Sequence, residues 1–151
     1  MRTAFLLLTL ASVLVAYDPV FVLDLKALVP YDMDKRQLNI LDKDQSLIRS
    51  DKKKKLDVIL ERQDENIKNK YKEVVEAKQL KYSNTMKARF AAARDLIGGD
   101  ATTKEFLTKY DKLNTDMSIS EKEARQGIKQ LMNSMDKNQR DIWKNLMKIQ
   151  S

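Results

Sequence analysis

The sequence predicts an all-α protein, a single-domain bundle of about five to six helices that contains a duplicated helix-turn-helix unit. Three observations favour this fold class. Glycine and proline are scarce, with three and two residues among 151, whereas charged residues make up 34% of the chain. Such a composition is typical of helical proteins rather than of sandwiches, barrels or disordered chains. Apolar residues recur at the helical period, and one pattern occurs twice.

The repeated pattern covers Leu41 to Leu60 (LDKDQSLIRSDKKKKLDVIL) and Leu113 to Met132 (LNTDMSISEKEARQGIKQLM), which start seventy-two residues apart. In each copy an apolar residue ends a helix, an acidic and hydroxylated turn follows, and a second apolar residue precedes a new helix. The aligned pairs include Leu41 with Leu113, Asp42 with Asn114, Asp44 with Asp116, Ser46 with Ser118, and Leu47 with Ile119. This pattern predicts an internal duplication.

Residues 1–16 are expected to be a secretory signal peptide. Arg2 supplies a positive end, Ala4 to Ala16 an apolar segment, and Ala16 a small residue before the cleavage point. The segment is too short for a stable membrane span and is followed by Asp18 and Pro19. We therefore expect a secreted, extracellular protein, with an uncleaved anchor as the alternative.

Residues 17–31 form an apolar N-terminal lead-in between the leader and a helical domain expected over residues 32–151. Pro19 and Pro30 bound this lead-in. Its apolar residues indicate either a short helix docked on the domain or a loose arm, and the sequence leaves both open. The apolar residues are Phe21, Val22, Leu25 and Leu28.

The domain begins with the first copy of the repeat. Asp32 or Asp34 is a suitable cap for a helix that runs to about Leu41, and a second helix is expected from about Ser50 to Gln63. In this copy Ile48 stands where the second copy has a capping serine. The first copy is therefore expected to take its cap from Ser50 or from Ser46.

The longest periodic segment runs from Asp64 to Ile97. Its apolar stripe slips near Lys78 to Ser83, and Ser83-Asn84-Thr85 are poor helix formers. One long helix and two helices with a kink are both compatible with this pattern. Gly98-Gly99 is expected to end the segment.

The last three helices are each expected to begin with a capping box, in which a hydroxyl or carboxylate side chain precedes Glu or Gln by three residues. The pairs are Thr102 with Glu105, Ser120 with Glu123, and Asp136 with Gln139.

The chain contains neither cysteine nor histidine. Nucleophile–base pairs of the Ser-His and Cys-His kinds cannot be formed, and zinc, copper and haem sites lose their usual ligands. The sequence therefore indicates a binding or interaction protein without enzymatic activity, with no certain cofactor.

The two acidic turns match the first part of a calcium-binding loop. Asp42, Asp44 and Ser46 fall on positions one, three and five, as do Asn114, Asp116 and Ser118 in the second copy. The glycine of position six and the glutamate of position twelve are missing, so a functional EF-hand is not expected. A weak magnesium site remains open, because magnesium needs only one or two carboxylates. The alternative is a pair of Asx turns between helices. The candidate metal ligands are Asp42, Asp44, Asn114 and Asp116.

Two further features have two interpretations each. The run of Lys52, Lys53, Lys54 and Lys55 is a candidate surface for anionic glycan or lipid, or simply a solvated face flanked by acidic residues. The helical stripe of Tyr82, Met86 and Phe90 would line a lipid pocket or form part of a core. No nucleic-acid-binding motif is present, so nucleic acid is not an expected partner.

The chain resembles the SXP/RAL family of secreted nematode antigens and allergens, also described as an Anisakis-allergen-like cation-binding domain. The resemblance covers about Val29 to Ile149. It depends on the order of short motifs, namely Leu38-x-Ile40, Asp42-x-x-x-Ser46-Leu47, Leu113-x-x-Asp116-x-Ser118-Ile119-Ser120-x-x-Glu123, Ile128-x-x-Leu131-Met132 and Arg140-Asp141-x-Trp143. It implies a secreted helical protein, loosely calmodulin-like, that binds magnesium and is recognised by host or extracellular proteins and antibodies.

Three functions are compatible with the sequence. The first is a secreted antigen-type interaction protein with weak magnesium binding. The second is an extracellular carrier of a small apolar, fatty acid-like ligand in the helical core. The third is adhesion to anionic glycan or lipid through the lysine run. A stable membrane span is not expected in any of them, and the sequence does not fix the oligomeric state.

Overall fold

We describe a computed structural model of the protein, which covers residues 17–96 and 101–149. Apart from one isolated β-bridge, all regular secondary structure in this part of the chain is helical, which confirms the predicted all-α fold. It contains seven helices, more than the five or six expected. They are α1 (Val22–Leu28), α2 (Asp32–Lys43), α3 (Arg49–Glu61), α4 (Glu65–Leu96), α5 (Ala101–Thr115), α6 (Glu121–Asn133) and α7 (Lys137–Met147). The expected signal peptide and Gly98-Gly99 lie outside the described residues.

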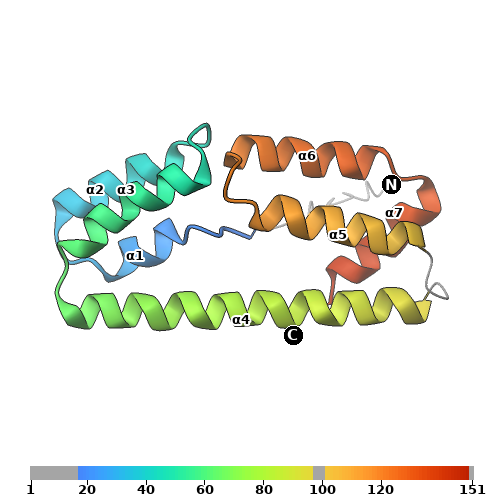
Figure 1. The fold of residues 1–151 in the computed structure, drawn as a ribbon, viewed down its shortest axis with the longest axis horizontal. Helices are drawn as coiled ribbons and strands as arrows, with labels where there is room; N and C mark the ends of the chain where they lie inside the picture. The colour runs from blue at the N-terminus through green and yellow to red at the C-terminus, as the bar shows by residue number, and fades with distance from the viewer. Residues whose placement is uncertain (1–16, 97–100, 150–151) are drawn as a thin grey trace, which may run out of the picture.

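Helix α4 is the axis of the molecule. It is one continuous helix of 32 residues and passes through Ser83-Asn84-Thr85 without a break, which decides between the two alternatives left by the sequence. Figure 1 shows α1, α2 and α3 beside its N-terminal half and α5, α6 and α7 beside its C-terminal half. Because packing on both halves of α4 exceeds the small propensity cost of three poor helix formers, the helix persists. The result is two lobes that share one helix.

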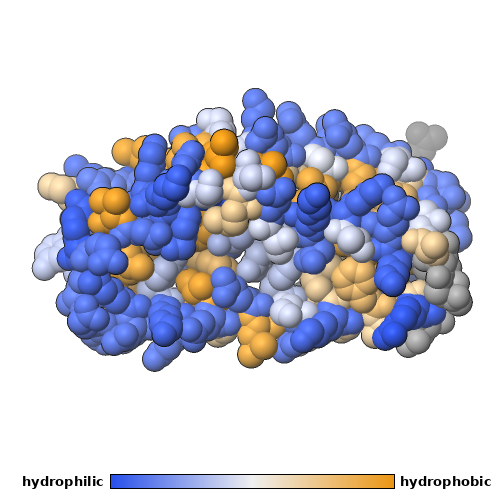
Figure 2. Space-filling model, in the orientation of Figure 1, coloured by the Kyte–Doolittle hydropathy of each residue, from blue (hydrophilic) through white to orange (hydrophobic). Residues whose placement is uncertain are grey.

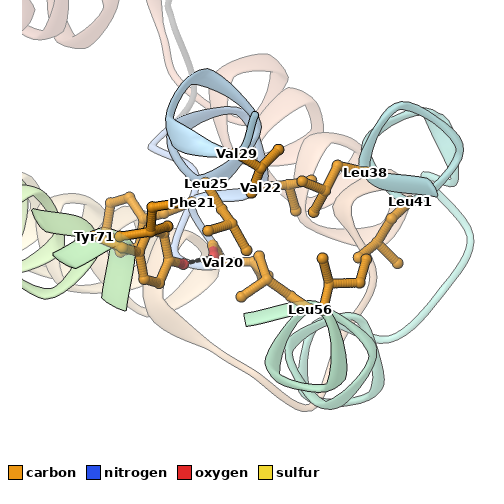
Figure 3. Packing of buried hydrophobic residues seen from close by; sticks show 11 residues of the cluster. Val20, Phe21, Val22, Leu25, Val29, Leu38, Leu41, Leu56 and Tyr71 are labelled. Atoms are coloured by element: carbon orange, nitrogen blue, oxygen red, sulfur yellow. Dashed lines mark hydrogen bonds between the residues drawn. The ribbon is translucent and has the colours of Figure 1, made fainter. Parts of the chain in front are cut away.

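The N-terminal lobe is built around the apolar lead-in. Figure 3 shows Val20, Phe21, Val22 and Leu25 pointing toward side chains of α2, α3 and α4. The lead-in is therefore a docked helix rather than a loose arm, and the expected domain boundary between residues 31 and 32 falls inside a common core. Phe21 precedes α1 with φ of 57°, a left-handed conformation that is unfavourable for a bulky residue. Burial of its ring offsets that strain.

The C-terminal lobe repeats this arrangement with its own core. Trp143 of α7 packs edge-on against Tyr110 of α5, with ring centroids 5.0 Å apart. Met86 of α4 is a buried member of this core, and Tyr82 and Phe90 of the same helix pack against it, so all three residues of the predicted stripe contact the core. The remaining buried members are Ala93, Leu107, Leu131, Met135 and Leu146.

The duplication is larger than the predicted helix-turn-helix. Helices α3 and α6 span residues 49–61 and 121–133, which are equivalent positions at the repeat distance, and α4 and α7 begin at the equivalent residues 65 and 137. Asp64 and Asp136 cap these last two helices in the same way, by accepting a backbone N–H from the residue three positions later. Each repeat is therefore a unit of three helices.

The capping predictions have mixed outcomes. Capping boxes are present at Ser120 and at Asp136, as expected. The box expected at Thr102 is wrong, because Thr102 is not the residue before a helix; it already lies within α5, which begins at Ala101.

Helix α3 of the first copy is capped by the backbone of the second copy, and the prediction of a serine cap is wrong. Ile48 provides no side-chain cap for α3; instead the N–H groups of Arg49 and Ser50 donate to the carbonyls of Ile119 and Met117. In return, the N–H of Lys122 donates to the carbonyl of Gln45. The two turns thus satisfy free N–H groups at each other's helix ends, and an antiparallel bridge joins Ile48 to Ser120.

Candidate functional site

The two acidic turns have the geometry of Asx turns. Asp44 Oδ1 accepts the N–H and the hydroxyl of Ser46, at 3.1 and 2.8 Å, and the N–H of Leu47. Asp116 Oδ1 accepts the N–H and the hydroxyl of Ser118, at 2.8 and 2.6 Å. These hydrogen bonds lower the pKa of both carboxyl groups below the usual value. One carboxylate oxygen of Asp44 and one of Asp116 are thereby occupied within their own turns.

The other two candidate metal ligands have different surroundings. Asn114 is fully buried, and its amide nitrogen donates to the carbonyl of Tyr110 at 3.0 Å. Asp42 is half-buried, and its backbone carbonyl lies 3.4 Å from Lys52 Nζ. In residues 17–96 and 101–149 no group of three or more acidic side chains is placed to hold a metal ion. The four candidates therefore do not form one cluster within this part of the chain.

The lysine run is not one surface. Lys52 is buried, with 3% of its surface exposed, because α3 turns it toward the interior. Lys52 therefore does not contribute to an exposed surface for anionic glycan or lipid. Lys53 pairs with Asp57 and Lys54 pairs with Asp51, so two of the remaining charges are balanced on the same helix. Lys55 is exposed.

A buried ion pair joins the lobes between the two turns. Arg49 Nε donates to Glu121 Oε1 at 2.7 Å, and Arg49 Nη2 donates to Oε2 at 3.2 Å. The guanidinium also donates to the carbonyls of Leu113 and Asp116. With 1% of Arg49 exposed, this network fixes the first copy of the repeat against the second.

Above the middle of α4 the two lobes enclose a cleft of about 1080 Å³. Figure 2 shows this hollow near the centre of the face, between the two lobes. Its lining combines aromatic and methionine side chains with basic ones. The apolar and aromatic members are Tyr17, Phe21, Leu23, Tyr82, Tyr110, Met132, Trp143 and Met147. The basic members are Lys43, Lys52, Lys78, Lys81, Arg89, Arg125, Lys144 and Lys148.

The segment before α1 forms one wall of this cleft. Tyr17 stacks on Tyr82 of α4 with ring centroids 3.9 Å apart, and Tyr82 donates its hydroxyl to Asp111 at 2.8 Å. Burial, together with Asp111, raises the pKa of Tyr82, and burial raises the pKa of Asp18. Tyr82 thus lines a cavity, as one interpretation of the aromatic stripe proposed, whereas Met86 and Phe90 do not.

Two residues of the cleft lining carry buried N–H groups that have no acceptor among the described residues. They are Trp143 Nε1 and Arg89 Nε, and both residues line the cleft. The other guanidinium nitrogens of Arg89 donate to the carbonyl of Met147 at 3.3 Å and approach Met86 Sδ at 3.8 Å. An unpaired buried donor is unfavourable and uncommon, and is expected mainly where a ligand or water can satisfy it.

Sequence reasoning did not single out Trp143 or Arg89 as site residues. One signal was available, since Trp143 is the only tryptophan and lies at the position equivalent to Tyr71. Tyr71 is paired, because its hydroxyl donates to the carbonyl of Val20 at 3.1 Å. The repeat therefore replaces a satisfied aromatic donor by one without an acceptor in the described structure.

Comparisons of the chain with family models, with curated proteins and with solved structures give no match. None of the helices in residues 17–96 and 101–149 has the length and apolar character needed to cross a membrane.

Proposed function

We propose that this protein is a secreted binding protein, without enzymatic activity, that takes a small amphipathic molecule into the cleft between its lobes. The observation that carries this proposal is the cleft itself, with an aromatic and methionine lining beside many basic side chains. Its volume of about 1080 Å³ lies at the upper end of the range typical of small-molecule sites. This is the carrier function that the sequence left as an alternative.

The two other functions have less support. Asp44 and Asp116 each hold their own turn and Asn114 is buried, so three of the four magnesium candidates are engaged elsewhere. The lysine run is divided between the buried Lys52, two local ion pairs and the exposed Lys55. An amphipathic ligand would instead use most of the cleft lining at once, since aromatic rings bind its apolar part and cations attract its polar part.

The extracellular setting is proposed from the leader-like residues 1–16 and from the resemblance to SXP/RAL antigens. In this setting the protein would collect its ligand outside the cell, where host or extracellular proteins and antibodies also meet its surface. Because the chain has no cysteine, its fold does not depend on disulfide formation in that environment.

The test is a titration of the mature protein with a neutral fluorescent apolar probe, N-phenyl-1-naphthylamine, followed by displacement with hexadecanoate. Trp143 lines the cleft and is the only tryptophan, so its own emission reports occupancy directly. Saturable binding with displacement is expected.

The matched variants are Tyr82→Ala, inside the cleft, and Tyr31→Ala, which is 67% exposed and outside it. Tyr82→Ala should weaken probe binding about tenfold through loss of aromatic contact area, and Tyr31→Ala should leave it unchanged. Absence of saturable probe and hexadecanoate binding, or equal effects of the two variants, would contradict the proposal.

A further inference from the structure

We propose that the cleft has a defined polarity, in which Trp143 Nε1 and Arg89 Nε donate to the carboxylate of a long-chain amphiphile at the end formed by the C-terminal lobe. This inference rests on the proposed function and goes beyond it, because it names the chemical class of the ligand's polar group and the residues that bind it.

Two side-chain donors beside the cleft are unsatisfied within the described part of the chain. Trp143 is 2% exposed, and its indole N–H has no acceptor among the described residues. Arg89 projects from α4 toward α7, where its Nη2 donates to the carbonyl of Met147, and its Nε has no acceptor in the same part of the chain. Trp143, Arg89 and Met147 all line the cleft. An acceptor that enters beside them would remove the unfavourable free energy of two buried unpaired N–H groups.

Acidic and basic side chains are distributed unevenly along the cleft. The lining carboxylates are Asp18, Asp24, Asp42 and Glu121. They lie on the N-terminal lobe and at the junction of the turns, where Asp24 is paired with Lys78 and Glu121 with Arg49.

The lining contributed by the C-terminal half of α4 and by residues 143–148 contains basic residues and, within the described chain, no acidic one. The basic residues are Lys81, Arg89, Lys144 and Lys148. An anionic group is therefore attracted to this end of the cleft and not to the other.

Within the described residues, the number of free donors on Arg89 and Trp143 matches the two oxygens of a carboxylate. Two of the three guanidinium nitrogens of Arg89 already have protein partners, which leaves Nε and the indole N–H as two separate donors. A carboxylate has two acceptor oxygens and one negative charge, so it can satisfy both donors. The apolar chain of such a ligand would extend toward Tyr17, Phe21 and Leu23 at the opposite end.

The experiment compares hexadecanoate with hexadecanol, which has a similar chain but no charge. Dissociation constants are obtained by displacement of N-phenyl-1-naphthylamine, so they do not depend on tryptophan emission. The wild type should prefer the acid by about ten- to a hundredfold, the range expected for hydrogen bonds to a charged group.

Trp143→Phe and Arg89→Gln each remove one donor and should reduce the preference for the acid severalfold, while hexadecanol binding is retained. Lys55→Gln is the matched control for Arg89→Gln, because it removes one positive charge from an exposed position outside the cleft. This control should keep the full preference for the acid.

The outcomes separate the inference from the proposed function. If neither lipid binds the wild type, the proposed function fails. If both lipids bind with equal affinity, or if the preference for the acid survives in both donor variants, the cleft binds ligands but the assigned carboxylate site is wrong.

A second measurement needs no substitution and covers the case in which a variant does not fold. The single indole N–H signal of the wild type should shift downfield in ¹⁵N–¹H spectra when hexadecanoate is added, and should shift much less with hexadecanol. Equal shifts with the two lipids would overturn the assignment of Trp143.

Discussion

Arg49 and Glu121 occupy equivalent positions in the two copies of the repeat, seventy-two residues apart, and they form a buried ion pair of 2.7 Å. The preceding residues, Ile48 and Ser120, form the antiparallel bridge and are also equivalent. The two copies therefore meet around a local pseudo-twofold axis. The duplication has placed opposite charges at one repeated position, so the contact favours association of one copy with the other over self-association of either copy.

This relationship predicts a strong dependence of stability on the pair. Arg49→Met leaves the Glu121 carboxylate largely buried without its partner and should reduce the free energy of unfolding by about 3–5 kcal/mol. The double variant Arg49→Met/Glu121→Leu removes both charges and should recover much of that loss. Urea unfolding followed by circular dichroism measures both effects. A double variant no more stable than the single one would contradict this account of the pair.

The docked lead-in makes a second prediction. Leu25 of α1 is fully buried, whereas Leu23 on the same helix is 53% exposed. Leu25→Ala should reduce the free energy of unfolding by about 2–5 kcal/mol through lost burial and the resulting cavity. Leu23→Ala is the matched control and should change it by less than about 0.5 kcal/mol. Equal effects in thermal or urea unfolding would mean that α1 does not belong to the core.

The acidic turns predict the pH dependence of stability. The folded protein holds the pKa of Asp44 and of Asp116 below the ordinary value of 3.8 by hydrogen bonds to Ser46 and Ser118. A folded-state pKa that is lowered contributes stability above pH 3.8, and this contribution is lost as the pH falls through the folded-state pKa.

Asp44→Asn/Asp116→Asn should therefore be less stable than the wild type at neutral pH and should converge with it in acid. Unfolding midpoints measured from neutral pH downward give the two curves. A constant difference between the curves at every pH would show that ionisation of these carboxylates does not contribute.

The same double variant tests the magnesium site implied by the resemblance to SXP/RAL antigens. Since one oxygen of each aspartate is occupied by its own turn, we expect no saturable amide shifts at Ser46 and Ser118 when magnesium is added at millimolar concentration. Saturable shifts in the wild type that disappear in the variant would place a cation at the turns and would support the first function considered from the sequence.

The candidate site was only partly accessible to sequence reasoning. Tyr82 was singled out as a possible pocket residue and does line the cleft, whereas Met86 and Phe90, which pack with it in the C-terminal core, do not. Residues three or four apart share a helix face, yet α4 contacts different neighbours along its length, so only one end of the stripe also reaches the cavity.

The sequence by itself determined the helices, two of the capping boxes and the existence of the repeat. These features follow from local spacing, because a capping side chain reaches only three residues along the chain and helical periodicity is read within a few turns. The Asx turns at Asp44 and Asp116, which the sequence offered as one of two interpretations, are local in the same sense.

Only the tertiary structure decided which charges are buried and where a cavity lies. Lys52 and Lys55 are neighbours in one lysine run, but α3 turns the first inward and the second outward. Arg49 forms its ion pair with Glu121 because two lobes pack on opposite halves of α4. The same arrangement places Trp143 beside the cleft, with an N–H that has no acceptor among the described residues. Such contacts depend on residues far apart in the chain, and no local pattern specifies the position and orientation at which they meet.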